Sequence, residues 1–222
     1  MSAACCAAKS TNSAPDPKHR RILWIVLAIN LIGFLVEIAA GMAAGSASLQ
    51  ADALDFLADA GNYAISLLVF GMALRWRAWA AFAKGTSMGV FGLWVVGSTA
   101  WYAWRGEVPA AEVMGGIGVM ALLLNAGCLL LLTGFRSGDA NMRSVWVCSR
   151  NDVIGNLAVM AAALGVFGTG TGWPDIIVAA IMAALALWGA GQVIEQAVAE
   201  LRQNHATVSG YESPSTSAPR HV

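Results

Sequence analysis

Three carboxylates stand within one apolar stretch of the sequence, which reads Leu49-Gln-Ala-Asp52-Ala-Leu-Asp55-Phe-Leu-Ala-Asp59-Ala-Gly-Asn62. An α-helix has about 3.6 residues per turn, so Asp55 and Asp59 would lie one turn apart on the same face, and Asn62 would continue that face. Two carboxylates about 6 Å apart do not both ionise comfortably unless a cation lies between them. The stretch therefore predicts a helix that holds a metal ion or a shared proton.

The composition around this stretch is that of a membrane protein. Of 222 residues, 58% are hydrophobic and 12% are charged, and the mean hydropathy is +0.63. Soluble domains carry about twice that share of charge. The net charge is zero, because 13 lysines and arginines balance 13 acids, so there is no electrostatic reason to expect a nucleic-acid partner.

Six apolar segments approach the length of about 20 residues that a helix needs to cross a lipid bilayer. We expect an all-α membrane protein with six transmembrane helices in a domain over residues 22–199. Residues 1–21 would form one tail, and residues 200–222 a second, disordered tail that is rich in Ser, Thr and Pro. The segments are Ile22–Ala44, Leu49–Leu74, Met88–Trp104, Val113–Thr133, Val145–Phe167 and Pro174–Ala199.

The basic residues predict how these segments are oriented. They precede the first segment, join the second to the third and the fourth to the fifth, and follow the sixth, while Arg105 stands on the opposite side. Basic residues concentrate in cytoplasmic loops, so both termini are expected to be cytoplasmic, in a plasma membrane that in a bacterium is the inner membrane. The residues on the predicted cytoplasmic side are Lys9, Lys18, Arg20, Arg21, Arg75, Arg77, Lys84, Arg136, Arg143, Arg202 and Arg220.

The fifth apolar segment complements the acidic one. Cys148, Asp152 and Asn156 recur every four positions and would share one stripe of a helix. Two helices that each present a pair of ligands one turn apart are able to build a four-ligand site. The expected ligands are Asp55, Asp59, Cys148 and Asp152, a set that suits a tetrahedral divalent ion such as Zn²⁺.

Other polar residues allow two interpretations each. Glu37 and Asp52 would belong to a path for protons or ions, or would simply be hydrogen-bonded to polar neighbours across helices. Cys5 and Cys6 would capture a soft metal ion at the cytoplasmic mouth, or are incidental in an Ala-rich tail. Asn62 and Asn156, which continue the two ligand stripes, are accessory candidates.

Longer motifs resemble a known family, the cation diffusion facilitators, which exchange divalent metal ions for protons. The match to its first two spans is Asn30-x3-Phe34-x2-Glu37-x3-Gly41-x3-Gly45-Ser46-x2-Leu49-x-Ala51-Asp52-Ala53-x-Asp55-x3-Asp59. The start of its fifth span resembles Asn141-x-Arg143-Ser144 followed by Cys148-x3-Asp152, and the start of its sixth resembles Trp173-Pro174-Asp175.

The resemblance implies a six-helix secondary transporter, usually a homodimer, and not an enzyme. It would export Zn²⁺, Cd²⁺ or Co²⁺ from the cytoplasm in exchange for protons, with no permanently bound cofactor. Family members usually carry His or Asp at the position of Cys148, and a thiolate favours softer ions. Most members continue into a cytoplasmic domain after the sixth span, so the resemblance implies a short form without it, since only residues 200–222 follow that span here.

Two other functions remain open at this point. One is a metal-binding or metal-uptake membrane protein in which Cys5 and Cys6 capture a thiophilic ion. A more remote one is an intramembrane aspartyl protease, although that family shows Gly-x-Gly-Asp where Asp152 here follows Arg-Asn. The sequence has no GxxxxGK[ST] motif, so a nucleotide is not an expected partner.

Overall fold

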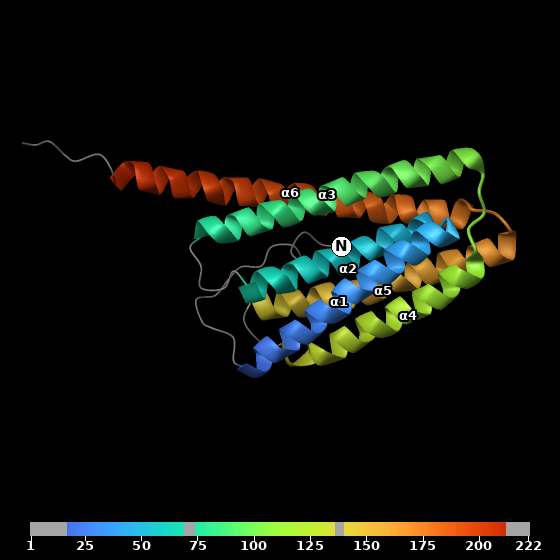
Figure 1. The fold of residues 1–222 in the computed structure, drawn as a ribbon, viewed down its shortest axis with the longest axis horizontal. Helices are drawn as coiled ribbons and strands as arrows, with labels where there is room; N and C mark the ends of the chain where they lie inside the picture. Colours follow the sequence, from blue (N-terminus) through green and yellow to red (C-terminus); the bar gives the residue numbers. More distant parts are fainter. Residues whose placement is uncertain (1–16, 69–73, 136–139, 212–222) are drawn as a thin grey trace, which may run out of the picture.

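A computed structural model of the chain describes residues 17–68, 74–135 and 140–211, without the side chains of some helical positions, including 140–149 and 203–211. Within these residues the chain forms six α-helices and one short 3-10 helix, and no strand (Figure 1). The α-helices are α1 (Pro17–Ala44), α2 (Ala47–Leu68), α3 (Leu74–Arg105), α4 (Ala111–Leu131), α5 (Ala140–Thr169) and α6 (Trp173–Tyr211), and the 3-10 helix is η2 (Thr133–Phe135). The expected all-α architecture is therefore confirmed.

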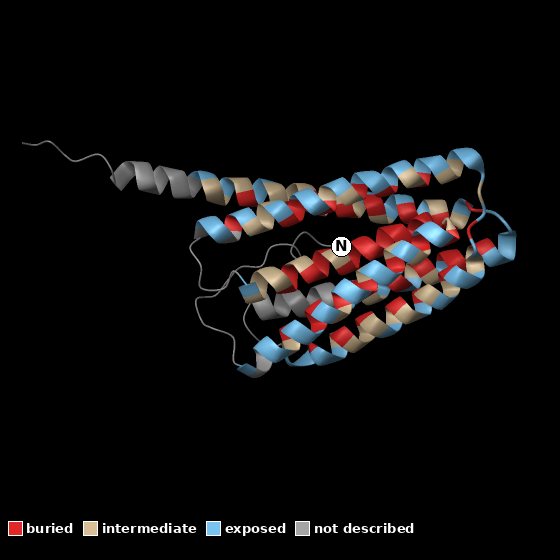
Figure 2. Cartoon of the chain, in the orientation of Figure 1, coloured by how far each residue is buried: buried red, intermediate tan, exposed pale blue. Residues whose placement is uncertain are grey.

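The helices run up and down along the long axis of one bundle, and α2 lies at its centre. Helix α3 packs mainly on α6, α1 on α2, and α4 on α5, while α2 also contacts α3, α5 and α6 (Figure 1). Consequently α2 is buried along most of its length, as Figure 2 shows, with 15 of its 22 residues inaccessible. The helix that carries the three carboxylates is thus the most enclosed element of the fold.

Glycines allow the close packing of these helix pairs. A Cβ atom at Gly92 of α3 would lie 2.8 Å from the Leu187 side chain of α6, and one at Gly85 would lie 2.9 Å from Ile194. In the α1–α2 pair, a Cβ at Gly33 would lie 2.7 Å from the ring of Phe56. At such distances a Cβ atom would force the neighbouring side chain to move, so the absence of a side chain at these glycines favours the close approach of the helices.

The start of α2 is held by an acid of α6. Asp175, which is 1% exposed, accepts hydrogen bonds from the Ser46 hydroxyl at 2.7 Å and from the backbone N–H groups of Ala47 and Ser48 at 2.8 and 3.0 Å. The first N–H groups of a helix have no partner within that helix, and a carboxylate is favoured at this positive end. Asp175 therefore serves as an N-cap that joins α6 to α2.

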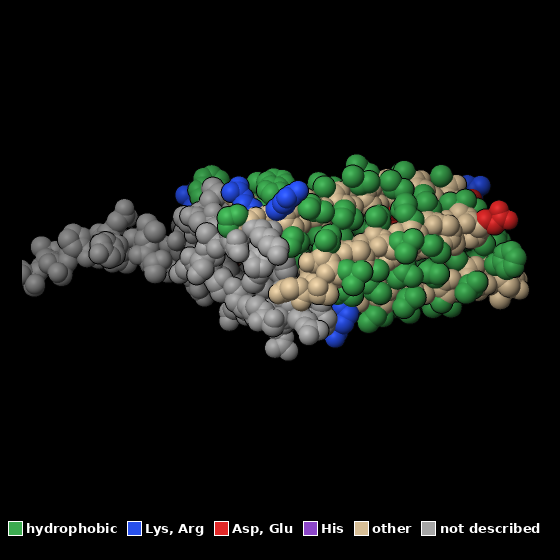
Figure 3. Space-filling view, turned by 90° about the horizontal axis from the view of Figure 1, so that it is seen from below, with side chains coloured by type: hydrophobic (Ala, Val, Ile, Leu, Met, Phe, Trp, Pro, Cys, Tyr) green, Lys and Arg blue, Asp and Glu red, His purple; other side chains and the backbone are tan. Residues whose placement is uncertain are grey.

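The outer surface is suited to contact with lipid. Figure 3 shows a face on which charged side chains lie at the two ends of the bundle, with a broad hydrophobic and uncharged band between them. Among the described residues, four helices are long and apolar enough to cross a membrane, namely Arg20–Ala44, Ala111–Leu131, Arg150–Thr169 and Trp173–Arg202. Helix α2 contains three acids, and the uncharged part of α3 is rich in Gly, Ser, Thr and Trp, which explains why these two fall outside that set. The count of six spans remains a prediction.

Several predicted boundaries require correction. Helix α3 begins at Leu74 and not at Met88, so Lys84 lies inside a helix and not in the predicted loop. Helix α1 already begins at Pro17, and α2 extends to Leu68, with residues 69–73 outside the described part. Residues 200–211, expected to be disordered, continue α6, whereas residues 212–222 lie outside the described part. The reason for the differences in α1, α3 and α6 is that apolar runs reveal only the lipid-facing part of a helix, and these helices continue beyond it with polar residues.

Candidate metal site

Two helices bring their acidic side chains together at the centre of the bundle. Asp59 of α2 and Asp152 of α5 are each 5% exposed, and the Asp59 carboxyl group faces both Asp152 and Asn62. The Tyr63 hydroxyl, one helical turn away, donates a hydrogen bond of 2.7 Å to Asp59 Oδ2. This arrangement fixes the orientation of Asp59 and leaves its carboxylate directed at the acid of the neighbouring helix.

The other two acids of α2 lie against bare backbone of α5. A Cβ atom at Gly155 would be 3.5 Å from Asp55 Oδ2 and 3.8 Å from Asp52 Oδ1. Both carboxylates are therefore close to one point on α5, three residues after Asp152. Because glycine has no side chain, α5 passes them without filling the space beside their oxygens.

Glu37 of α1 faces Asp52 across the α1–α2 contact. Both side chains are 0% exposed, and none of their four carboxyl oxygens is hydrogen-bonded to a described residue. Buried polar atoms nearly always have a partner, so these oxygens are unusual. Because the two carboxyl groups face each other across the α1–α2 contact, both interpretations of Glu37 and Asp52, as a path for protons or ions and as polar neighbours paired across helices, remain predictions.

Asn62 and Asn156 are also placed by hydrogen bonds. Asn156, which is fully buried, donates through Nδ2 to the backbone oxygen of Asp152 at 2.8 Å. Asn62 accepts a hydrogen bond from the Lys84 ammonium of α3. The sequence analysis placed Lys84 in a loop, and the available signal was the absence of proline between Ala78 and Met88, which would have allowed α3 to extend backwards.

The cysteines of the predicted site lie beyond what can be described. Cys148 belongs to α5, but its side chain is not among the described ones, and Cys5 and Cys6 fall outside the described residues. Among the side chains that the structure does describe, no group of three or more His, Cys, Asp or Glu residues is close enough to hold a metal ion. The described geometry thus brings Asp59 and Asp152 together without assembling a complete set of ligands.

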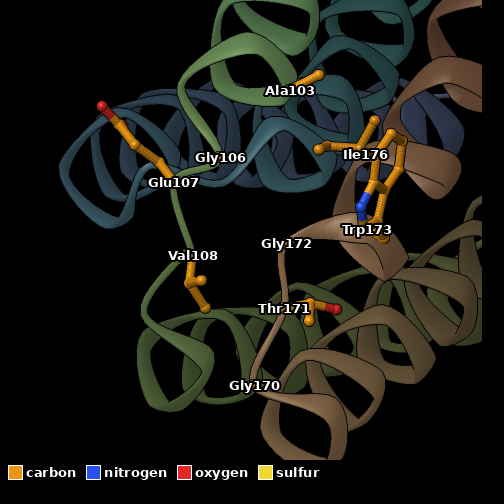
Figure 4. A pocket seen from close by; sticks show the side chains of 9 residues that line it. All are labelled: Ala103, Gly106, Glu107, Val108, Gly170, Thr171, Gly172, Trp173 and Ile176. Atoms are coloured by element: carbon orange, nitrogen blue, oxygen red, sulfur yellow. The ribbon is translucent and has the colours of Figure 1, made fainter.

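A pocket of about 210 Å³ lies at the end of the bundle where α3 ends and α6 begins. It is formed between the connection from α3 to α4 and the connection from α5 to α6, with Glu107, Thr171 and Trp173 in its wall (Figure 4). The candidate ligands whose side chains are described, Asp55, Asp59 and Asp152, do not line this pocket. It is therefore distinct from the acidic centre.

Comparison with known proteins decides the family. Residues 23–202 match the sequence model of the cation efflux transmembrane domain. The chain belongs to the cation efflux family. The resemblance to cation diffusion facilitators that we inferred from the acidic motifs is thereby confirmed, and the matched residues of this cation efflux domain include all of α2, α3, α4 and α5.

Two relatives in the cation efflux family carry the name zinc transporter ZitB. The relative from Yersinia pestis is 28% identical over 212 residues, which cover 87% of this chain and 66% of that protein. The relative from Yersinia pseudotuberculosis serotype I (strain IP32953) is 27% identical over 204 residues, which cover 84% of this chain and 64% of that protein. The chain therefore spans slightly less than two-thirds of the length of these relatives.

Proposed function

We propose that this member of the cation efflux family is a secondary transporter that exports a divalent transition metal ion from the cytoplasm in exchange for protons. Asp55, Asp59, Cys148 and Asp152 would be the ligands of the transported ion. The observation that supports this proposal most directly is that Asp59 and Asp152, on different helices, face one another at the buried centre of the bundle. Adjacent buried carboxylates are stabilised by a cation or by protons, which are the two species that an antiporter exchanges.

Competition between the metal ion and protons for the same oxygens couples the two flows. When the carboxylates are ionised they bind the cation, and when they are protonated they release it and return carrying protons. Alternating access would arise from movement of packed helix pairs around a site near the middle of the membrane. Helix α3 packs mainly on α6, α1 on α2 and α4 on α5, and these pairs would be the units that move.

The remaining features of the proposal follow from the charge pattern and the relatives. The ion would be Zn²⁺, Cd²⁺ or Co²⁺, and the names of the two Yersinia relatives favour zinc. The chain would span the inner membrane of a bacterium six times with both termini in the cytoplasm, and would act as a homodimer without nucleotide or permanently bound cofactor. Glu37 and Asp52 would lie on the path of protons or ions.

Everted membrane vesicles with an imposed proton gradient test this proposal. Vesicles containing the wild-type chain should accumulate Zn²⁺ when their interior is acidic, and Asp59→Ala or Asp152→Ala should abolish accumulation while the protein is still present in the membrane. Glu112→Ala is the matched control, because Glu112 is an exposed acid of α4, and it should behave as wild type. Accumulation retained in both aspartate variants would refute the site, and transport in the opposite direction would favour metal uptake.

A further inference from the structure

Lys84 is a basic residue in an unexpected place. It is 8% exposed and is the one lysine or arginine that is buried among the described side chains. Its aliphatic chain crosses Gly61 of α2, where a Cβ atom would lie only 3.0 Å from Lys84 Cγ. The ammonium group then donates a hydrogen bond to the Asn62 side chain. Because Gly61 has no side chain, the aliphatic part of Lys84 can pass directly over the backbone of α2.

This placement brings an ammonium group to the acidic centre. Lys84 lies within electrostatic range of Asp59, whose carboxyl group in turn faces Asp152. Asn62 follows Asp59 by three residues on α2, so the ammonium group lies about one helical turn from the carboxylate. Lys84 is therefore next to the proposed ligands, on the side where α2 ends and α3 begins.

Packing alone does not account for a lysine at this position. Only the aliphatic part of the side chain is needed to cover Gly61, and methionine or leucine would do so without burying a charge. A buried ammonium is costly unless it is paired with opposite charge. The acids of α2 and α5 supply that charge, which indicates that the ammonium group is retained for its interaction with them.

We propose that Lys84 is a built-in cation of the metal site, which balances one carboxylate and weakens binding of the transported ion enough for it to be released. This inference rests on the proposed function. Asp55, Asp59 and Asp152 carry three negative charges, and Lys84 offsets one of them before the divalent ion binds. Without the lysine, the same carboxylates hold a divalent ion with an excess of negative charge and bind it more tightly.

Lys84→Met tests the charge while keeping a side chain able to cover Gly61. The full-length chain is purified in lipid nanodiscs, and its Kd for Zn²⁺ is measured by competition with a metal-sensitive dye. Lys84→Met should lower the Kd by about tenfold or more, since one unit charge near a divalent ion has an effect of at least this order at an effective dielectric constant of about 20. In proteoliposomes the same variant should export Zn²⁺ more slowly, because release is slower. Lys84→Arg keeps the charge and should leave the Kd within about threefold of wild type.

Two controls separate a charge effect from structural damage. Arg105→Met also removes one positive charge, but from an exposed arginine that is paired with Glu107 at 3.0 Å, and it should leave the Kd unchanged. Lys84→Gln provides a second neutral variant if Lys84→Met does not fold. The decisive case is one in which wild type binds Zn²⁺ and Asp59→Ala does not. If a folded neutral variant of Lys84 then has an unchanged or higher Kd, this inference is overturned and the proposed function stands. If wild type itself binds no metal ion, both proposals are wrong.

Discussion

Replacing Asp175 by alanine should destabilise the whole bundle, because this one side chain joins α6 to the start of α2. The substitution removes three hydrogen bonds to a buried carboxylate, at 2.7, 2.8 and 3.0 Å. Hydrogen bonds to a charged group contribute about 1.5 to 3 kcal/mol each, but water that enters the gap would recover part of this free energy. The loss of an N-cap alone costs about 0.5 to 2 kcal/mol, which sets the lower end of the expected effect. We therefore expect Asp175→Ala to lower the free energy of unfolding by about 3 kcal/mol.

Thermal unfolding of the purified chain in detergent, followed by circular dichroism, measures this effect. For a chain of this size a loss of 3 kcal/mol corresponds to a decrease in Tm of roughly 6 to 12 °C. Glu112→Ala is the matched control, since Glu112 is also an acid in the first turn of a helix but is exposed, and it should change the free energy of unfolding by less than about 0.5 kcal/mol. Equal Tm values for the two variants would refute the role of Asp175 as the cap of α2.

Two further predictions concern helix packing and ion preference. Gly33→Val should lower the free energy of unfolding by about 1 to 3 kcal/mol relative to the control Gly97→Val. A side chain at Gly33 meets the Phe56 ring, whereas one at Gly97 meets nothing within 4 Å. Equal Tm values for the two variants would contradict this prediction. Cys148→Ser and Cys148→His should each shift transport away from Cd²⁺ towards harder ions, as measured by competition between Cd²⁺ and Co²⁺ in proteoliposomes. An unchanged ion preference in both variants would show that the thiol is not a ligand.

The helices and the acidic centre could be predicted from the sequence to different degrees. The boundaries of α4 lie within two residues of the predicted segment Val113–Thr133, because its apolar run coincides with the helix. The spacing of Asp55, Asp59 and Asp152 indicated that α2 and α5 face one another, and the structure places Asp59 opposite Asp152. Periodicity along a single helix reveals which residues share a face. When the other faces of the helix are apolar and suited to lipid, the polar face is expected to turn towards the interior of the bundle.

Lys84 and Asp175 were not predicted as parts of the interior, for the same physical reason. Each lies at the end of an apolar run or beyond it, where a charged residue normally meets water. What buries them is contact with α2: Gly61 makes room for the chain of Lys84, and the unpaired N–H groups at the start of α2 bind Asp175. These contacts join residues that are more than 20 positions apart in the sequence, and no local pattern encodes them.

The burial of α2 explains how a helix with three acids is accommodated in this fold. On the insertion scale, each carboxylate near the membrane centre costs about 2.5 to 3.5 kcal/mol, so the three together cost on the order of 10 kcal/mol. Alanine is the most frequent residue of α2, and its small side chain offsets little of the insertion cost of the carboxylates. Accordingly, α2 is not among the helices that are apolar enough to span a membrane alone. Contacts with α1, α3, α5 and α6 surround it instead, so that its acids meet protein groups and the Lys84 charge and do not meet lipid. Acids that would expel an isolated helix from the bilayer are therefore retained here at the point where four other helices converge.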